Sequence, residues 1–149
     1  GRTTYAGDLK EDIDVAKILD KVPTSEVAIC SLAGIIVCNI KSDDEYRSTA
    51  YYALKMISKC IHMSDYALPH IGWTAKQRMS AGVGLVGVAY EMAKKGLNYD
   101  SHEGLEEIHR MAERHSYFLI EQSLKIAKET QVAPWMYKTK WPDGWLPID

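Results

Sequence analysis

The chain has only three cysteines, and they form no recognisable pattern. Three is an odd number, and Cys30 and Cys38 both fall in one apolar stretch. Small secreted domains that depend on disulfides instead carry even numbers of cysteines in a framework. Because no C-x-x-C pair is present, the sequence also offers no paired sulfur ligands for a metal. The cysteine content therefore favours a reducing, cytoplasmic setting.

The sequence also lacks a long uncharged run and an excess of charge of either sign. Its longest uncharged stretch, residues 27–40, is shorter than the roughly 20 residues that a membrane-spanning helix needs. A net charge of −2 gives no reason to expect nucleic acid or an anionic membrane as a partner. The first residues contain no apolar segment of the secretory kind, so we expect no signal peptide.

Spacings typical of metal ligands and nucleophilic serines are missing as well. His102 and His109 are seven residues apart and His109 and His115 six apart, so neither pair shares a helix face at i, i+4. There is no G-x-S-x-G segment. Glutamates in residues 105–130, Glu107 among them, share that stretch with basic residues. We interpret them as a solvated helix face and expect no metal site.

What the sequence does contain is an apolar, β-branched run with a thiol inside it. Residues 26–40 carry no charge after Glu26, which predicts a strand buried on both faces, as in a parallel sheet covered by helices. Cys30 in this strand is either inert packing or a redox group held on a rigid element. We interpret Cys38 and Cys60 as packing.

The rest of the chain is mainly helical in pattern. Helices are expected at 8–22, 44–62 and 105–130, with a further one ending at Gly96 and a short strand near 81–88. Residues 64–79 are expected to be an ordered connection, and the aromatic tail to lie across a surface. The long helix should start at a capping box, residues 100–103, and point these residues inward: Leu105, Ile108, Ala112, His115, Leu119 and Ile126. The fold class is helix-rich α/β, and two strands are too few for an independent sheet, so we expect a piece of a larger protein.

A glycine motif, G-x-G-x-x-G, occupies Gly82 to Gly87. Dinucleotide binding requires a strand directly before such glycines, and residues 76–81 do not form a convincing strand pattern. The favoured interpretation is that the glycines permit close packing of a short strand and its helix.

Residues 27–33, Val-Ala-Ile-Cys-Ser-Leu-Ala, resemble the strand of class I ribonucleotide reductase large (catalytic) subunits that carries one of two redox-active cysteines. Further segments resemble that family in the same order along the chain. They are Tyr52-Ala53-Leu54, Pro69 with Lys76-Gln77-Arg78, Gly82 to Gly87, Leu124 to Glu129, and Pro134-Trp135 with the final Gly-Trp-Leu-Pro-Ile-Asp. The resemblance covers residues 26–149, and residues 1–25 would be a variable connection.

This resemblance implies a single partial domain, an internal fragment forming a section of a ten-stranded α/β barrel. The family is an oxidoreductase that reduces ribonucleotides to deoxyribonucleotides for DNA replication by thiol and radical chemistry. Cys30 would be a redox-active catalytic thiol and Leu32 would line the substrate pocket. The chain itself would bind no cofactor: a small partner subunit supplies the radical, and an external dithiol of the thioredoxin or glutaredoxin type supplies electrons. Its partners would be the remainder of the catalytic subunit, that small subunit and the ribonucleotide.

Several family elements are absent from this sequence. Neither the N-x-C-x-E element of the radical cysteine nor the second redox cysteine occurs in it. We therefore expect the isolated chain to be inactive. The alternative is a non-catalytic helical α/β interaction module with a structural Cys30, and a third hypothesis is dinucleotide binding at residues 82–87.

Overall fold

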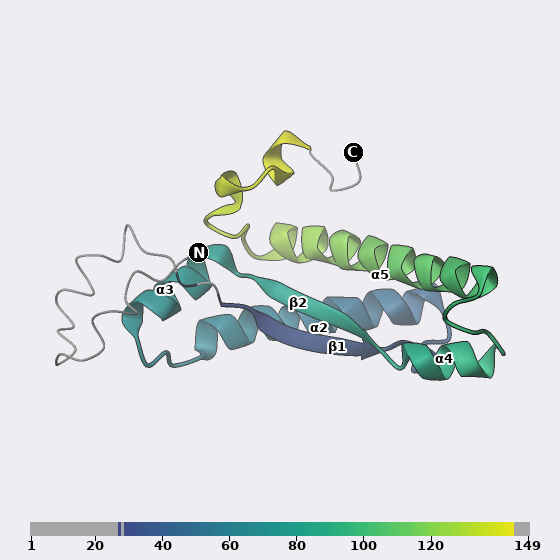
Figure 1. The fold of residues 1–149 in the computed structure, drawn as a ribbon. Coiled ribbons are helices and arrows are strands. Elements are labelled where there is room, and N and C mark those ends of the chain that lie inside the picture. Colours follow the sequence, from purple (N-terminus) through teal and green to yellow (C-terminus); the bar gives the residue numbers. More distant parts are fainter. Residues whose placement is uncertain (1–26, 28, 145–149) are drawn as a thin grey trace. The chain divides into compact units, whose positions relative to one another are not determined.

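The computed structural model describes residue 27 and residues 29–144 (Figure 1). In chain order the elements are β1 (Ser31–Ile36), the 3₁₀ helix η1 (Val37–Asn39), α2 (Asp43–Met63), α3 (Pro69–Arg78), β2 (Ala81–Val86), α4 (Val88–Lys94), α5 (His102–Glu129), and the 3₁₀ helices η2 (Met136–Lys138) and η3 (Trp141–Asp143). The helix predicted at 8–22 lies outside the described residues. Two compact units are present: the strand unit (residues 32–59 and 81–131) and the α3 unit (described residues up to 31, with 60–80 and 132–144).

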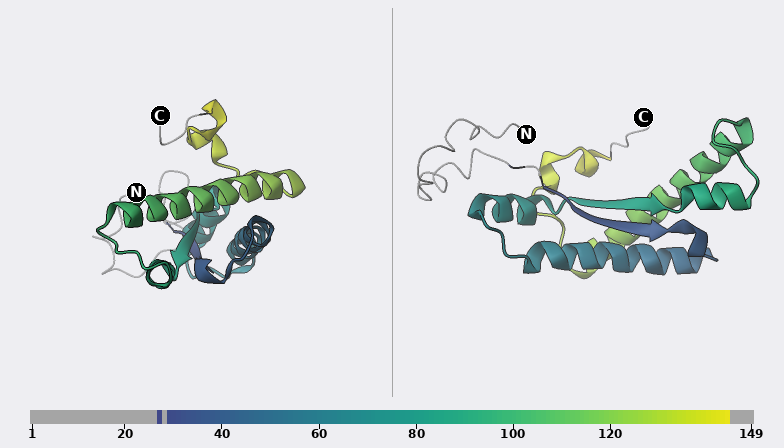
Figure 2. Two further views of the ribbon diagram at one scale, coloured as in Figure 1. Left: turned by 90° about the vertical axis from the view of Figure 1, so that its right-hand side faces the viewer. Right: turned by 60° about the horizontal axis from the view of Figure 1, so that its bottom comes forward.

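The strand unit is built on a two-stranded sheet of β1 and β2. The strands run side by side in the same direction (Figures 1 and 2). A parallel pair needs a long crossover connection, here the residues from η1 through α3. One face of the sheet is covered, because Ile35 of β1 packs with Tyr46 of α2 and Phe118 of α5 in the core.

The predicted strand at 26–40 is longer than the observed one, and the prediction of burial on both faces is wrong. β1 has six residues, and residues 37–39 form a 3₁₀ helix. Burial alternates along β1: Ile35 is 1% exposed, whereas Leu32 is 78% and Ile36 49% exposed. The reason is that α2 and α5 both pack on the face that carries Ile35. Nothing in the described part of the chain covers the other face to the same extent.

The helix predicted at 44–62 is confirmed as α2. A serine caps its N-terminus: the backbone N–H of Glu45 donates to Ser42 Oγ at 3.2 Å. Three acidic residues in the first turn also stabilise this N-terminus, because their negative charges lie near the positive end of the helix dipole. Cys60 is exposed on this helix, so the prediction that it is a packing residue is wrong.

The longest predicted helix is confirmed as α5, and Ser101 caps it, with Ser101 Oγ accepting from the Gly104 N–H at 3.0 Å. Its buried face differs from the predicted one. His115 and Ile126 are buried as expected, but Leu105 is 57% exposed. The buried stripe instead includes polar members, Glu107 and Gln122, which a search for apolar periodicity passes over. A Cβ at buried Gly104 would overlap the Asn98 carbonyl, so this glycine allows close packing of the loop before α5.

The α3 unit joins a short helix to the aromatic tail. The expected ordered connection at 64–79 contains the ten-residue helix α3, which has proline at its start. Trp135 is 8% exposed and meets Trp73 of α3 edge to face, with ring centroids 4.8 Å apart. The Trp135 backbone N–H donates to the Gln77 carbonyl at 3.0 Å. The prediction that the tail packs on a surface is confirmed at this residue.

Candidate functional site

Cys30 lies one residue before β1, and its thiol is exposed. The Sγ lies 3.6 Å from the Ser31 carbonyl oxygen. The adjacent backbone is held, because the Ser31 N–H donates to the Ser80 carbonyl at 3.1 Å. The sequence left open whether Cys30 is an inert packing residue. A packing residue would be buried, and among the described residues none buries Cys30.

The open sheet face is the uncovered side of the two strands, formed by Leu32, Gly34 and Ile36 of β1 with Gly84 and Val86 of β2. All five are exposed, as expected when alternate side chains of a strand share a face. Gly34 permits a close approach here, because a Cβ on it would lie 2.7 Å from Val86 Cγ2. The face offers apolar surface and no titratable group of its own, so acid–base or redox chemistry here needs groups from elsewhere.

The glycine motif does not have the geometry of a dinucleotide site. Gly82 and Gly84 lie inside β2, and only Gly87, with φ of 82°, occupies the turn before α4. The dinucleotide fingerprint instead places its glycines in the turn after a strand. The close-packing interpretation is confirmed at Gly87, where a Cβ would lie 3.2 Å from the half-buried Cys38 Sγ.

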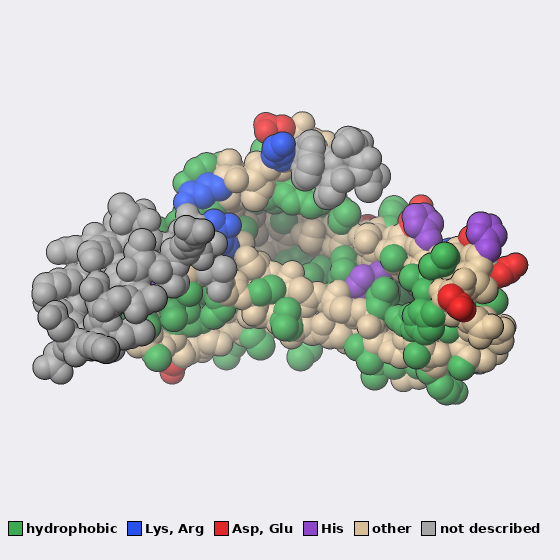
Figure 3. Space-filling view, viewed as in Figure 1, with side chains coloured by type: hydrophobic (Ala, Val, Ile, Leu, Met, Phe, Trp, Pro, Cys, Tyr) green, Lys and Arg blue, Asp and Glu red, His purple; other side chains and the backbone are tan. Residues whose placement is uncertain are grey.

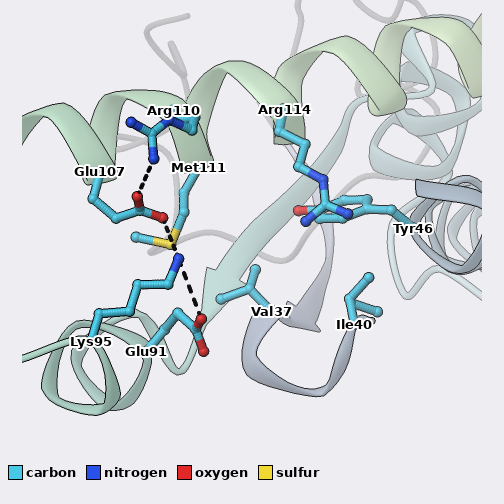
Figure 4. Close-up of a pocket in the computed structure, with 9 residues that line it drawn as sticks. All are labelled: Val37, Ile40, Tyr46, Glu91, Lys95, Glu107, Arg110, Met111 and Arg114. Atoms are coloured by element: carbon cyan, nitrogen blue, oxygen red, sulfur yellow. Dashed lines mark hydrogen bonds and ion pairs between the residues drawn. The ribbon is translucent and has the colours of Figure 1, made fainter. Parts of the chain in front are cut away.

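A pocket of about 220 Å³ lies in the strand unit between α4, α5 and η1 (Figure 4). Glu107 is its buried carboxylate, accepting from Lys95 Nζ at 2.6 Å and from an Arg110 guanidinium nitrogen at 2.5 Å. The hydrogen bond to Glu107 raises the pKa of Lys95 against the opposing effect of burial. The solvated-face interpretation is therefore wrong for Glu107. Its partner Lys95 is the residue directly after α4, and spacing within α5 cannot reveal such a pair.

A buried hydrogen-bonded chain links α2, α5 and β2. The Tyr46 hydroxyl lies 2.7 Å from His115 Nδ1, and His115 Nε2 lies 2.7 Å from the Val83 carbonyl oxygen. Burial raises the pKa of Tyr46, partly opposed by the positive charge of Arg114. The sequence placed His115 on the inner face of its helix, but it gave no signal for a partner 69 residues away.

Among residues 27 and 29–144, no three histidine, cysteine or acidic side chains gather as a metal site would require. No helix in the same residues has both the length and the apolar character needed to cross a membrane.

Comparison with known proteins places this chain in a family. Residues 16–149 match the family model "Ribonucleotide reductase, barrel domain". The "Ribonucleoside-diphosphate reductase subunit alpha" of Haemophilus influenzae is 29% identical over 124 residues, 83% of this chain and 16% of that protein. The subunit alpha of Enterobacteria phage T4 is 29% identical over 130 residues, 85% of this chain and 17% of that protein.

Subunit alpha of ribonucleoside-diphosphate reductase 1 from Escherichia coli is 34% identical over 85 residues, 57% of this chain and 11% of that protein. The chain thus spans less than a fifth of the length of these three relatives. The family match covers nearly all of the sequence, residues 16–149, and includes both strands and the open sheet face. This chain belongs to the ribonucleotide reductase family, in its barrel domain.

Proposed function

We propose that this chain is a section of the catalytic subunit of a class I ribonucleoside-diphosphate reductase, with Cys30 as one of its two redox thiols. Residues 26–149 would form part of a ten-stranded α/β barrel, and residues 1–25 a variable connection, as one partial domain. The observation that carries the proposal is the exposed Cys30 thiol at the start of β1. Leu32, at 78% exposure on the open sheet face, would line the substrate pocket.

Exposure and a held backbone together support a redox role for Cys30. A structural cysteine normally packs as a small buried hydrophobe. A thiol that forms a disulfide, with an S–S bond of about 2 Å, needs an accessible Sγ on a rigid backbone. The hydrogen bond from the Ser31 N–H to the Ser80 carbonyl provides such an anchor next to Cys30.

The proposed chemistry is a two-electron reduction of the ribose 2′ carbon. Cys30 and a second cysteine, supplied by other polypeptide, each give up one hydrogen and form a disulfide. The 2′ carbon–oxygen bond breaks, the oxygen leaves as water and a carbon–hydrogen bond forms. An external dithiol of the thioredoxin or glutaredoxin type then reduces the disulfide. The small radical-generating subunit supplies the radical that starts the reaction, and this chain binds no cofactor of its own.

The partners follow from the same assignment. The remainder of the catalytic subunit would supply the second cysteine and the other strands, and a ribonucleotide would be the substrate. We propose a cytoplasmic location, in keeping with the reducing setting that free thiols require. The chain alone lacks half of the thiol pair, so it should form no deoxynucleotide.

The test is turnover in the assembled enzyme, with this chain, the rest of its catalytic subunit and the small subunit. Replacing Cys30→Ser should reduce thiol-dependent deoxynucleotide formation to background while co-purification of the parts is unchanged. Cys60→Ser is the matched control, because Cys60 is also exposed but lies on α2. Undiminished turnover in Cys30→Ser would refute the redox role, and deoxynucleotide formed by the isolated chain would refute its dependence on partners.

A further inference from the structure

We propose that Met79 is a positioning residue for Cys30. Its left-handed backbone ends α3 and aims the Ser80 carbonyl at the N–H of Ser31, next to the thiol. These four residues all belong to the α3 unit. In the described part of the chain, Met79 is the only non-glycine residue with a positive φ. The inference deepens the redox role proposed above and rests on it.

The backbone conformation of Met79 is one that glycine usually supplies. Its φ of 49° and ψ of 41° are left-handed, and helices very commonly end at a glycine in this conformation. A residue with a Cβ is crowded there by the following carbonyl oxygen, so methionine adopts it at a cost. Such conformations persist where the surrounding contacts enforce them, and they cluster at functional sites. The α3 unit therefore holds a costly turn at this residue.

Hydrogen bonds on both sides of Met79 enforce the turn. The Met79 N–H donates to the Ala75 carbonyl at 2.8 Å, which closes the last turn of α3. On the other side, the Ser80 carbonyl accepts from the Ser31 N–H at 3.1 Å. Because Ser80 follows Met79 directly, the direction of its carbonyl depends on the backbone angles of Met79. A different φ at Met79 would turn this carbonyl away from Ser31.

The Ser80–Ser31 hydrogen bond acts on Cys30 through a single peptide group. The Ser31 N–H belongs to the planar group that also contains the Cys30 carbonyl, so holding it fixes the Cα of Cys30. The Cys30 thiol is exposed, so its side chain has little packing to hold it. Residues that react together must be held within about 0.5 Å of the productive geometry. The position of Sγ therefore depends on this backbone anchor.

Met79→Asn and Met79→Val form a matched pair that separates backbone from side chain. Both remove the methionine side chain, but asparagine tolerates the left-handed conformation and a β-branched residue does not. In the full chain, hydrogen exchange of the Ser31 amide, resolved by NMR, should be at least about tenfold faster in Met79→Val. Met79→Asn should stay within about threefold of wild type. Circular dichroism verifies that the helices are kept.

Lys76→Val is the control for adding a β-branched residue to α3, because Lys76 is exposed within that helix. A helical backbone accepts valine at a small cost, so Ser31 exchange should stay within about threefold of wild type.

The second measurement is turnover in the assembled enzyme, with this chain, the rest of its catalytic subunit and the small subunit. Met79→Val should lower kcat by at least about tenfold, because misplaced reacting groups lose rate steeply. Met79→Asn should keep kcat within about threefold of wild type, since the turn is retained. Co-purification of the parts should be equal in both variants. Rescue by asparagine is what a role of the methionine side chain would not produce.

Three results would overturn the positioning role: unchanged Ser31 exchange in Met79→Val, wild-type turnover in that variant despite faster exchange, or turnover lost equally in Met79→Asn. If Met79→Val fails to fold, Met79→Asn still decides, because loss of its turnover contradicts a role of the backbone alone. Failure of the redox role is recognised separately, by undiminished turnover in Cys30→Ser, whatever the Met79 variants do.

Discussion

At the scale of single residues, the strand unit depends on buried polar groups whose partners are distant in sequence. Glu107 is the clearest case. An ionised carboxylate at 7% exposure is tolerated only with charged partners, and Lys95 and Arg110 each bond one of its two oxygens. Because Lys95 directly follows α4, Glu107 ties the end of that short helix to α5.

Replacing Glu107→Gln should destabilise the chain by on the order of 2 kcal/mol at pH 7, because two cations lose their shared carboxylate and the amide presents a donor to them. The change should also alter how the free energy of unfolding depends on pH in the alkaline range. Glu107 raises the pKa of Lys95 above its ordinary 10.5, so this contribution is complete below that pH and is lost as pH rises through the folded value. The variant should therefore lose less stability than wild type above pH 10.5.

Urea unfolding at pH 7 and across the alkaline range measures both effects. Glu113→Gln, an exposed glutamate on the same helix, serves as the control and should change stability by no more than about 0.5 kcal/mol. Equal stability of Glu107→Gln and wild type would show that the buried pair contributes nothing.

At the scale of elements, an aromatic side chain of the tail packs on α3 in the α3 unit. Trp135 packs against Trp73, and Lys138 and Arg78 lie over its ring at 3.4 and 5.6 Å from the centroid. The same residue donates its backbone N–H to the C-terminal turn of α3. Among the described residues of the tail, Trp135 is the buried one, and it fastens the tail to α3.

Trp135→Ala should therefore release residues 132–144 from α3. Truncating a buried tryptophan leaves a cavity and costs about 3 to 5 kcal/mol. Hydrogen exchange followed by mass spectrometry should show faster exchange in 132–144 and in α3. Trp141→Ala, at a position 46% exposed, is the matched control and should leave that exchange unchanged. Unchanged protection in Trp135→Ala would mean that other contacts hold the tail.

Elements with strong local signals could be predicted from sequence, and those decided by distant contacts could not. α2 and α5 begin at serine caps that can be identified from a few residues. The sequence does not predict α3, because Pro69 and Gly72 are residue types that commonly interrupt helices. In fact proline suits the first turn of a helix, and Gly72 allows Tyr66 to approach, with a Cβ there only 2.8 Å from its ring.

The candidate site likewise contains residues that the sequence could identify and features that it could not. The sequence singled out Cys30 and Leu32 through motifs, and it could not show that β1 is covered on only one face. The hydrogen-bond partners of His115 were equally hidden, because Tyr46 and Val83 lie 69 and 32 residues away along the chain.

At the scale of the whole molecule, many large apolar side chains of the described residues are exposed. Figure 3 shows hydrophobic side chains at many places on the surface. On the open sheet face, Leu32, Ile36 and Val86 are 78%, 49% and 46% exposed. The relatives it matches are more than five times as long, so in the proposed enzyme the remaining polypeptide would cover this face.

The isolated chain should consequently self-associate through the open sheet face, because contiguous exposed apolar patches drive association in water. Sedimentation velocity should show a mean mass that rises with concentration. The triple variant Leu32→Thr, Ile36→Thr and Val86→Thr should weaken this association by at least about tenfold, since threonine keeps strand propensity while it reduces apolar area.

The control for this prediction removes as many apolar side chains from a helix, with Leu105→Gln, Ile120→Gln and Leu124→Gln on α5, all of them exposed. These side chains are spread along α5 and do not form one flat face, so their removal should have the smaller effect. Circular dichroism of both variants verifies that the fold is kept. If the α5 variant dissociates the chain and the sheet variant does not, the chain associates through α5, and the open sheet face is not where the remainder of the proposed enzyme would pack.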